Sequence, residues 1–334
     1  MTITLSAAIL FAIVLIFLLS DEPGRTIYYF FVGPFTNRYY LGNLLNSAIP
    51  LIFAGLGIAV AFRSSAFNLG GEGQVYAGAL VTTAVCLALP DTNGFVGGVT
   101  AVFAGTFAGA VLAGISGYFK MKWDTDLLIS SFLISAAVVL VVNFIITGPL
   151  DDPSSSLLST RKIGEQYRLV QIFKPSKLDI SILFSFLAAL AVYTFMYHTH
   201  RGYEMRICGL NPEFARYGGV HVNTYIVLPM VLSGALHGLG GGLVVTGTHY
   251  MALKEFTFGL GWNGIAVALI AKNHPLGVIP AALFFAYLDA GAKAAMLHSD
   301  VTFEIAAIIQ SVIFYLVTAQ AIFSFVKYKR RVSV

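Results

Sequence analysis

Long apolar runs, each followed by a short polar segment, make up most of this chain of 334 residues. A helix of about 20 apolar residues crosses the hydrocarbon core of a bilayer, so each run of that length predicts a transmembrane helix. By this rule we predict ten spans, near residues 3–20, 41–62, 68–90, 94–119, 127–147, 179–197, 223–247, 259–271, 275–298 and 303–326. The pattern predicts an all-α fold, a polytopic transmembrane helical bundle with some broken or re-entrant segments, in which residues 1–334 form one membrane domain.

Composition supports a membrane protein over a soluble one. Charged residues make up 11% of the chain and the AVILMFWYC set makes up 57%, whereas soluble domains have roughly a quarter and a half. The first apolar run, Ile3 to Leu19, has no Lys or Arg before it and no small-residue cleavage site after it. We therefore expect a retained span there and no signal peptide. The partner of this surface is the lipid bilayer, and the net charge of +4 gives no reason to expect nucleic acid.

The distribution of Lys and Arg predicts the orientation, because loops on the cytoplasmic side carry an excess of both. The short outer loops would hold only Arg25, Arg38 and Lys254, and the long outer loop 148–178, with five cations, exceeds the length for which the rule is sharpest. We predict that both termini are cytoplasmic. The inner segments then hold eleven cations: Arg63, Lys120, Lys122, Arg201, Arg206, Arg216, Lys272, Lys327, Lys329, Arg330 and Arg331.

The most polar stretch lies in an inner loop and reads I-C-G-L-N-P-E-F-A-R-Y-G-G-V-H-V from Ile207. Asn211 is a favourable helix N-cap, Pro212 suits the first helical position, and Glu213 lies at the positive end of the helix dipole. Gly218-Gly219 would end the helix after roughly two turns. We predict a short helix at the inner surface, with a solvated connector as the alternative.

A second polar stretch, A-F-N-L-G-G-E-G-Q from Ala66 to Gln74, leads directly into an apolar run. Gly70, Gly71 and Gly73 should break the helix, and free backbone groups at membrane depth must face protein or a wet cavity. An unpaired carboxylate at the bilayer centre costs about 3 kcal/mol on insertion scales, so Glu72 should face a cavity or a partner. The alternative is a polar turn that caps the next helix.

A third stretch, F-G-L-G-W-N-G-I-A-V-A-L-I-A-K-N-H-P-L-G from Phe258 to Gly277, contains an apolar run of only about 13 residues. Short or glycine-interrupted segments of this kind mark binding sites in transporters. The run begins with Trp262 and Asn263, an indole and an amide, which are suitable contacts for a flat polar solute.

Two further patterns indicate helix packing. Small residues recur at every fourth position in two predicted spans, which lets helix backbones approach closely. The positions are Gly97, Ala101, Gly105, Gly109, Ala113 and Gly117 in one span, and Gly234, Gly238 and Gly242 in the other. His237 lies inside the second series, and we interpret it as a hydrogen-bonded packing residue. Asp289 and Lys293 share one helix face and are interpreted as a structural ion pair.

These stretches resemble permease subunits of ATP-binding-cassette (ABC) importers, in the branch that holds ribose, nucleoside and branched-chain amino-acid permeases. The segment G-L-N-P-E-F-A-R-Y-G-G-V-H-V resembles their coupling helix, F-N-L-G-G-E-G-Q resembles F-N-I-G-x-E-G-Q of the nucleoside type, and the third stretch resembles G-x-G-[FW]-x-G-I-A-V-A-L-L-G-x-x-H-P-x-G. The resemblance implies a single permease domain over 1–334, with 198–222 as its cytoplasmic coupling loop.

The resemblance also implies two groups of functional residues. An ATPase subunit would dock on Asn211, Pro212, Glu213, Phe214, Ala215, Arg216, Tyr217, Gly218 and Gly219. The translocation path would be formed by Phe67, Asn68, Gly70, Gly71, Glu72, Gly73, Gln74, Asn143, Trp262 and Asn263.

One region departs from the nucleoside permeases. Those proteins usually have an Asn-Glu-led motif and a later Asn in the fifth span, whereas this chain reads T-D-L-L-I-S-S-F-L-I-S, with Asp126 in place of the acidic pair. Asn143 is the candidate substitute for the missing amide. The solute class therefore stays open between nucleosides, a related heteroaromatic compound such as riboflavin, and, third, simple sugars.

The expected partners follow from the resemblance. They are an ABC ATPase on the cytoplasmic side, a second permease chain that is homologous but different, and an extracytoplasmic substrate-binding protein received by 148–178, all at a bacterial cytoplasmic (inner) membrane. The chain has no G-x-x-x-x-G-K-[ST] motif, so we expect no ATPase activity, no cofactor of its own and no metal site. An ion-coupled secondary carrier is the rival hypothesis, although only Glu72, Asp289 and Glu304 could serve a relay.

Overall fold

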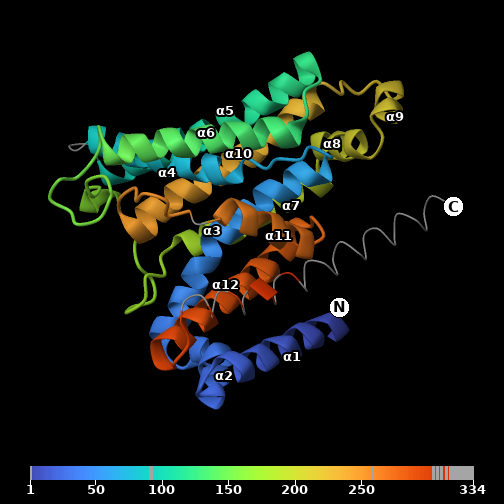
Figure 1. Ribbon diagram of the computed structural model, residues 1–334. Helices are drawn as coiled ribbons and strands as arrows, with labels where there is room; N and C mark the ends of the chain where they lie inside the picture. The colour runs from blue at the N-terminus through green and yellow to red at the C-terminus, as the bar shows by residue number, and fades with distance from the viewer. Residues whose placement is uncertain are drawn as a thin grey trace.

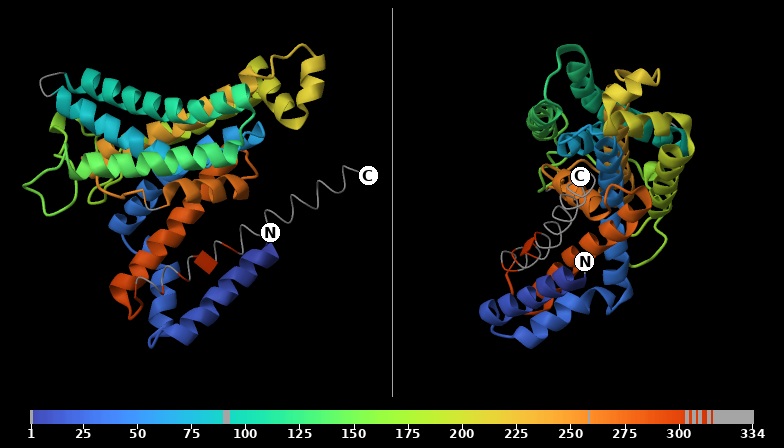
Figure 2. Two further views of the ribbon diagram at one scale, coloured as in Figure 1. Left: turned by 45° about the horizontal axis from the view of Figure 1, so that its top comes forward. Right: turned by 90° about the vertical axis from the view of Figure 1, so that its right-hand side faces the viewer.

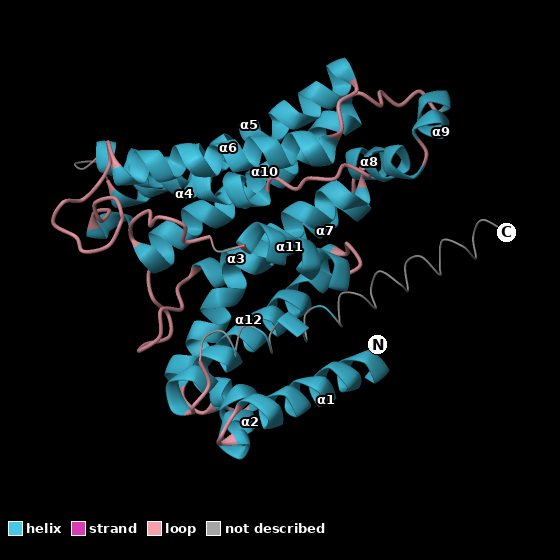
Figure 3. Cartoon of the chain, in the orientation of Figure 1, coloured by secondary structure: helices cyan, strands magenta, loops and turns pink. Residues whose placement is uncertain are grey.

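The computed structural model describes residues 2–89, 93–257 and 259–302, together with 305, 308, 311, 312 and 315. The predicted tenth span, near 303–326, falls almost wholly outside these described residues, as do Phe258, Glu304 and the basic residues from Lys327 to Arg331. Within the described residues the elements are helices and loops, without a strand (Figure 3). The all-α prediction is therefore confirmed.

The elements follow one another along the chain as shown in Figure 1. They are α1 (Thr2–Leu19), α2 (Pro23–Phe31), the 3₁₀ turn η1 (Gly33–Phe35), α3 (Arg38–Arg63), α4 (Gly71–Ala88), α5 (Gly94–Trp123), α6 (Leu127–Thr147), the 3₁₀ turn η2 (Glu165–Tyr167), α7 (Ser181–His198), α8 (His200–Leu210), α9 (Pro212–Tyr217), α10 (Thr224–Val244), the π-helical turn η3 (Val245–His249), α11 (Leu260–Ile270) and α12 (Pro275–His298).

Six of the described helices are long and apolar enough to cross a membrane: α3, α5, α6, α7, α10 with its extension to His249, and α12. Each matches a predicted span, and α1 and α4 lie where two more were expected. Helix α11 is different, because 11 residues extend about 16 Å, roughly half of the hydrocarbon thickness. The predicted short segment at 259–271 is thus a half-length helix that depends on its neighbours.

Helix α3 is the central element of the bundle. In its apolar stretch 83% of the residues are buried, against 22% in α5, α6 and α7, whose outer faces suit lipid. It contacts α7, α10, α11 and α12. Helices α4, α5, α6 and α10 lie together on one side of α3, and α1, α2 and α12 lie on the other (Figures 1 and 2).

The small-residue series of α5 and α10, which the sequence assigned to helix packing, pack against each other. All six predicted positions of α5 are buried. A Cβ built on Gly109 would lie 2.9 Å from the Cα of Gly238, and one on Gly78 of α4 would lie 2.6 Å from the same atom. Side chains at these glycines would therefore force the backbones apart. This close contact holds α4, α5 and α10 as one rigid group.

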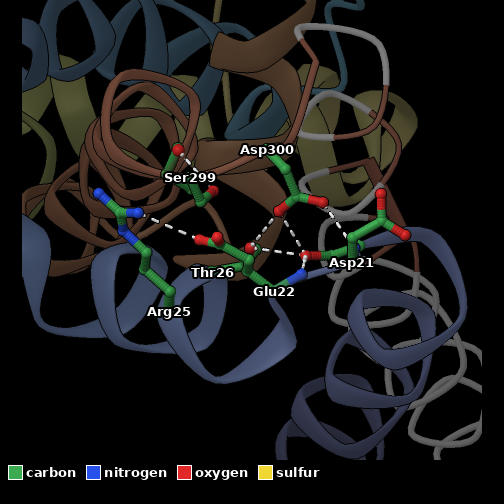
Figure 4. Close-up of polar contacts among 8 residues, drawn as sticks. Asp21, Glu22, Arg25, Thr26, Ser299 and Asp300 are labelled. Atoms are coloured by element: carbon green, nitrogen blue, oxygen red, sulfur yellow. Dashed lines mark hydrogen bonds and ion pairs between the residues drawn. The ribbon is translucent and has the colours of Figure 1, made fainter.

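Asp300 attaches the N-terminal helices to the end of α12 (Figure 4). Its carboxylate accepts hydrogen bonds from the Ser20 hydroxyl at 2.7 Å, the Asp21 backbone N–H at 2.5 Å and the Thr26 hydroxyl at 3.4 Å. The Ser20 hydroxyl, followed by the other donors, holds the pKa of the Asp300 carboxyl below its ordinary range. The turn between α1 and α2 is thereby fixed to the α12 end.

The polar segment 198–222 and the long loop 148–178 lie at opposite ends of the bundle. Helices α8 and α9 project at one end, and the long loop covers the other (Figure 1). Within that loop Ile163 and Tyr167 are buried, and isolated bridges join Asp151 to Thr160 and Ser159 to Leu253. The loop is therefore packed against the bundle.

Candidate functional site

The segment before α4 is a buried amide turn. Asn68 is fully buried, and its Nδ2 donates to Gln74 Oε1 at 2.9 Å and to the Ser233 hydroxyl of α10 at 2.9 Å. Its Oδ1 accepts from the Gly70 N–H at 2.8 Å and from Gln74 Nε2 at 3.0 Å. A side chain that hydrogen-bonds the backbone two residues ahead favours a turn at that point in place of a helix.

This turn corrects one expectation about the glycines. We expected Gly70, Gly71 and Gly73 all to interrupt a helix, but Gly71 and Gly73 lie in the first turn of α4, and the non-helical stretch ends at Gly70. The reason is that the Asn68 amide closes the turn, so regular helix follows at once.

Two serines of α6 complete the surroundings of the turn. The Ser131 hydroxyl accepts from the Leu69 N–H at 3.0 Å, and the Ser135 hydroxyl accepts from the Gly73 N–H at 2.8 Å. These serines lie in the region where the sequence lacks the amide of nucleoside permeases, and sequence reasoning missed their role. Their i, i+4 spacing on one helix face was the available signal. Asp126, the acidic residue of the same region, accepts from the Ile129 N–H at 3.1 Å and caps α6.

Glu72 binds the start of α11. Its two carboxylate oxygens accept hydrogen bonds from the backbone N–H groups of Gly259, at 3.0 Å, and Gly261, at 2.8 Å. An anion at a helix N-terminus accepts hydrogen bonds from the free backbone N–H groups and is stabilised by the positive end of the helix dipole. The helices touch here, since a Cβ on Gly261 would lie 2.9 Å from the carbonyl carbon of Gly71. The structure thus brings the two predicted path segments together through a carboxylate and two glycines.

Exposed aromatic rings lie beside this junction. Trp262, in the first turn of α11, is 50% exposed, and its ring centroid lies 6.2 Å from that of Phe132 of α6. Phe67 is 43% exposed and packs edge-on against Phe62 at 5.0 Å. Asn263 is half-buried. Hence the rings are available to a solute, while the amides of Asn68 and Gln74 are held inside the protein.

Asn143 of α6 lies at a second junction. There it meets Tyr76, which is one turn further along α4 than Glu72. The Asn143 Oδ1 accepts from the Tyr76 hydroxyl at 2.5 Å. That hydroxyl also lies 3.2 Å from the Leu253 carbonyl and accepts from the Glu255 N–H at 2.8 Å. Asn143 is therefore part of the attachment between α4, α6 and the loop before α11.

His237 is buried at the contact of α3, α4 and α10. Its Nδ1 lies 2.8 Å from the Ser233 carbonyl, one turn earlier, which agrees with the predicted packing role. Asp289 and Lys293 form an ion pair at 2.6 Å, and the Lys293 side chain is 62% exposed. The geometry is that of the predicted i, i+4 pair.

The predicted short helix is present as α9. The Asn211 side chain accepts from the Phe214 N–H at 3.0 Å, Pro212 is the first helical residue, and the helix ends before Gly218. Arg216 pairs with Glu213 at 3.0 Å. Beside this charged pair, two large rings of α9 are exposed, Phe214 at 64% and Tyr217 at 92%, and Leu210, the last residue of α8, is 85% exposed.

Comparison with known proteins agrees with this geometry. Residues 40–318 match the family described as branched-chain amino acid transport system / permease component. The chain is 33% identical to the probable riboflavin import permease protein RfuC of Treponema pallidum (strain Nichols), covering 95% of this chain and 84% of the relative. It is 31% identical to the guanosine ABC transporter permease protein NupP of Bacillus subtilis (strain 168), covering 88% and 85%. It is 29% identical to the glucose ABC transporter permease protein TsgB13 of Haloferax volcanii, covering 95% and 86%. The chain therefore belongs to this permease family and is a membrane-spanning permease component of an ABC importer.

Proposed function

We propose that this permease forms the translocation path for a nucleoside-like or related heteroaromatic solute such as riboflavin. The observation that carries the proposal is the half-exposed indole of Trp262, placed at the start of α11 by the bond between Glu72 and the backbone of Gly259 and Gly261. A flat indole face suits the stacking of a base or flavin ring. Two of the relatives are named for riboflavin and guanosine, each of which carries a flat heteroaromatic ring system.

The predicted path residues would then divide by role. Phe67, Trp262 and Asn263, which are exposed or half-buried, would contact the solute. The buried polar residues would hold the glycine-rich backbone in place: Asn68, Gln74 and Asn143, with Glu72 as the link to α11. An importer must release its solute inward, so a few polar contacts beside an open aromatic face suit this step better than a closed pocket.

The proposed assembly follows from the two ends of the molecule. The apolar side chains of α9 would dock on a partner ABC ATPase, which supplies the energy, because the chain lacks the phosphate-binding motif. The loop 148–178 would receive a substrate-binding protein at the outer face of the cytoplasmic membrane. A second permease chain, homologous but different, would complete the path. Both termini would be cytoplasmic.

A simple-sugar permease is the second candidate, because one relative is named for glucose. It predicts less dependence on an aromatic face. The contacts of two candidate relay acids argue against an ion-coupled carrier. Both oxygens of Glu72 already accept backbone hydrogen bonds, and Asp289 is paired with Lys293. A relay acid would need a free carboxylate that exchanges protons with a wet cavity.

Transport by the assembled importer tests the proposal. Uptake of labelled riboflavin, guanosine and glucose would be measured with wild-type permease and with Trp262→Ala. Base stacking on an aromatic side chain contributes about 1–3 kcal/mol, so we expect an apparent affinity at least about fivefold weaker for the transported heteroaromatic solute. The matched control is Phe95→Ala, which removes an 80% exposed ring from α5, remote from the junction. Uptake of glucose alone, or equal effects of both variants, would overturn the proposal.

A further inference from the structure

A group of aromatic rings and cations surrounds Tyr197 at the α9 end of the bundle. We call Arg63, Tyr193, Tyr197, Arg206 and His274 the Tyr197 cluster. The guanidinium carbons of Arg206 and Arg63 lie 4.7 Å and 5.9 Å from the centroid of the Tyr197 ring. The rings of Tyr193 and His274 lie 5.3 Å and 5.4 Å from it. Helices α3, α7 and α8 and the N-cap residue of α12 thus contribute to one small region.

Backbone contacts fix the two arginines in this arrangement. Arg63 is the last residue of α3, and just after it the Ser65 hydroxyl donates to the Gly209 carbonyl of α8 at 2.6 Å. A Cβ on Gly209 would lie 2.7 Å from the Cα of Ser64, so α8 approaches the end of α3 directly. Arg206 donates to the Met196 carbonyl of α7. The convergence on Tyr197 is therefore built into the fold.

Within the part of the chain that the structure describes, the positive charge of the cluster has no carboxylate paired with it. Among the described residues, neither Arg63 nor Arg206 has a carboxylate within ion-pair distance. Glu204, on the same helix as Arg206, accepts from the Tyr225 hydroxyl and lies 3.5 Å from His200. Two guanidinium groups near one ring repel each other, and the repulsion is stronger beside a membrane than in open water. An anion from outside the chain would relieve it.

The position of the cluster indicates the source of that anion. Arg63 ends α3, Tyr197 is next to last in α7, and His274 precedes α12, so the cluster lies where membrane helices end. Tyrosine rings favour the headgroup level of a bilayer, and arginine binds phosphate oxygens through paired N–H groups. Basic pockets between transmembrane helices on the cytoplasmic side bind anionic headgroups.

We propose that the Tyr197 cluster binds the phosphate of an anionic membrane lipid in the leaflet at the α9 end. Arg63 and Arg206 contact the phosphate oxygens. The rings of Tyr193, Tyr197 and His274 pack against the glycerol region. The lipid thereby joins the ends of α3, α7 and α12 to α8, the helix that precedes α9. This inference does not depend on the solute that the permease carries.

Lipid retention by the purified full-length chain tests the inference. The chain would be equilibrated with equal amounts of phosphatidylglycerol and phosphatidylcholine, and bound lipids would be counted by native mass spectrometry. We expect wild-type chain to retain phosphatidylglycerol preferentially. The double variant Arg63→Gln, Arg206→Gln should lose this preference by about tenfold or more, because each surface cation contributes about 1 kcal/mol to binding of anionic lipid. Arg201→Gln is the matched control, since Arg201 is an exposed cation of the same helix outside the cluster.

Two further measurements separate the possible outcomes. The double variant Arg63→Lys, Arg206→Lys keeps both charges and should retain an intermediate preference, which distinguishes lost binding from misfolding. Excess inorganic phosphate should not displace the lipid; displacement by it would identify a small-anion site and overturn the lipid assignment. Equal retention by wild type and the Gln double variant, or equal loss in the Arg201→Gln control, would also overturn the proposal.

Discussion

Glu72 shows how one side chain serves two helices. It lies in the first turn of α4, where a carboxylate favours its own helix dipole, and it bonds the N–H groups at the start of α11. Helix α11 begins at a glycine N-cap without a side-chain cap, so the carboxylate of another helix replaces the missing cap. The orientation of Trp262, in the first turn of α11, therefore depends on Glu72.

Replacing Glu72 by Gln should cut transport while the complex still assembles. The variant keeps one acceptor oxygen and places an NH₂ group against an N–H donor, which removes one charge-assisted hydrogen bond, of about 1.5–3 kcal/mol. The start of α11 should loosen, and transport per assembled complex should fall. Glu72→Asp, which keeps the charge, is the control and should retain more activity. The checks are solute uptake, ATP hydrolysis and recovery of the complex.

The opposite pattern would assign Glu72 a purely structural role. In that case the Gln variant would assemble poorly, and each assembled complex would transport at the wild-type rate. A lone carboxylate at membrane depth is costly, so the sequence predicts a partner or a cavity for Glu72. The partner itself is not predictable from the sequence, since the donors are backbone N–H groups, which every residue except proline carries.

Among the elements, α9 is where sequence and structure agree most closely. Its N-cap, first-turn proline and glycine stop are local signals, and local signals determine a short helix without tertiary context. Its exposure could not be read from the sequence. Phe214 and Tyr217 project from a six-residue helix that is too short to be stable alone and is held by the burial of Ala215.

A photo-crosslinker at Phe214 should therefore capture the ATPase partner in the assembled importer. The exposed apolar face of α9 has no cover within the described part of the chain, and desolvation of large rings is a typical source of interface energy. A crosslinker at Phe103, a 71% exposed ring of α5, is the matched control and should capture no soluble subunit. If Phe214 captures no ATPase in an intact complex, the docking site lies elsewhere.

The remaining features were predictable to different degrees, according to how far each depends on tertiary contacts. The glycine series of α5 and α10 was readable from a four-residue period, because it records close packing directly. The π-helical turn at Val245–His249 and the short helix α2 were not predicted. The first depends on how the chain leaves α10 toward Tyr250, which has φ of 61°. The second is a nine-residue helix within a stretch whose charges, proline and glycine resemble an irregular loop.

At the scale of the whole molecule, the separation of its two ends makes the orientation testable. Helices α8 and α9 lie at the opposite end of the bundle from the segment 148–178 (Figure 1), so labelling one end determines the side of the other. The native cysteines should contribute little background, because Cys86 and Cys208 are both buried. Burial, followed by the nearby Glu204 carboxylate, raises the pKa of the Cys208 thiol, which lowers the fraction of reactive thiolate at neutral pH.

A membrane-impermeant thiol reagent should therefore label Ser156→Cys in intact cells and Arg201→Cys only after permeabilisation. Both positions are exposed, so the difference measures sidedness and not accessibility within the fold. The expected result follows from the cations of the inner loops and places α9 where an ATPase can reach it. The reverse pattern would place the exposed rings of α9 outside the cell, where no ATPase could dock, and would remove the physical basis of the coupling assignment. Labelling of both positions in intact cells would show that the reagent enters the cells, and labelling of a cytoplasmic marker protein detects such entry. The wild-type chain measures the background from the two buried native cysteines.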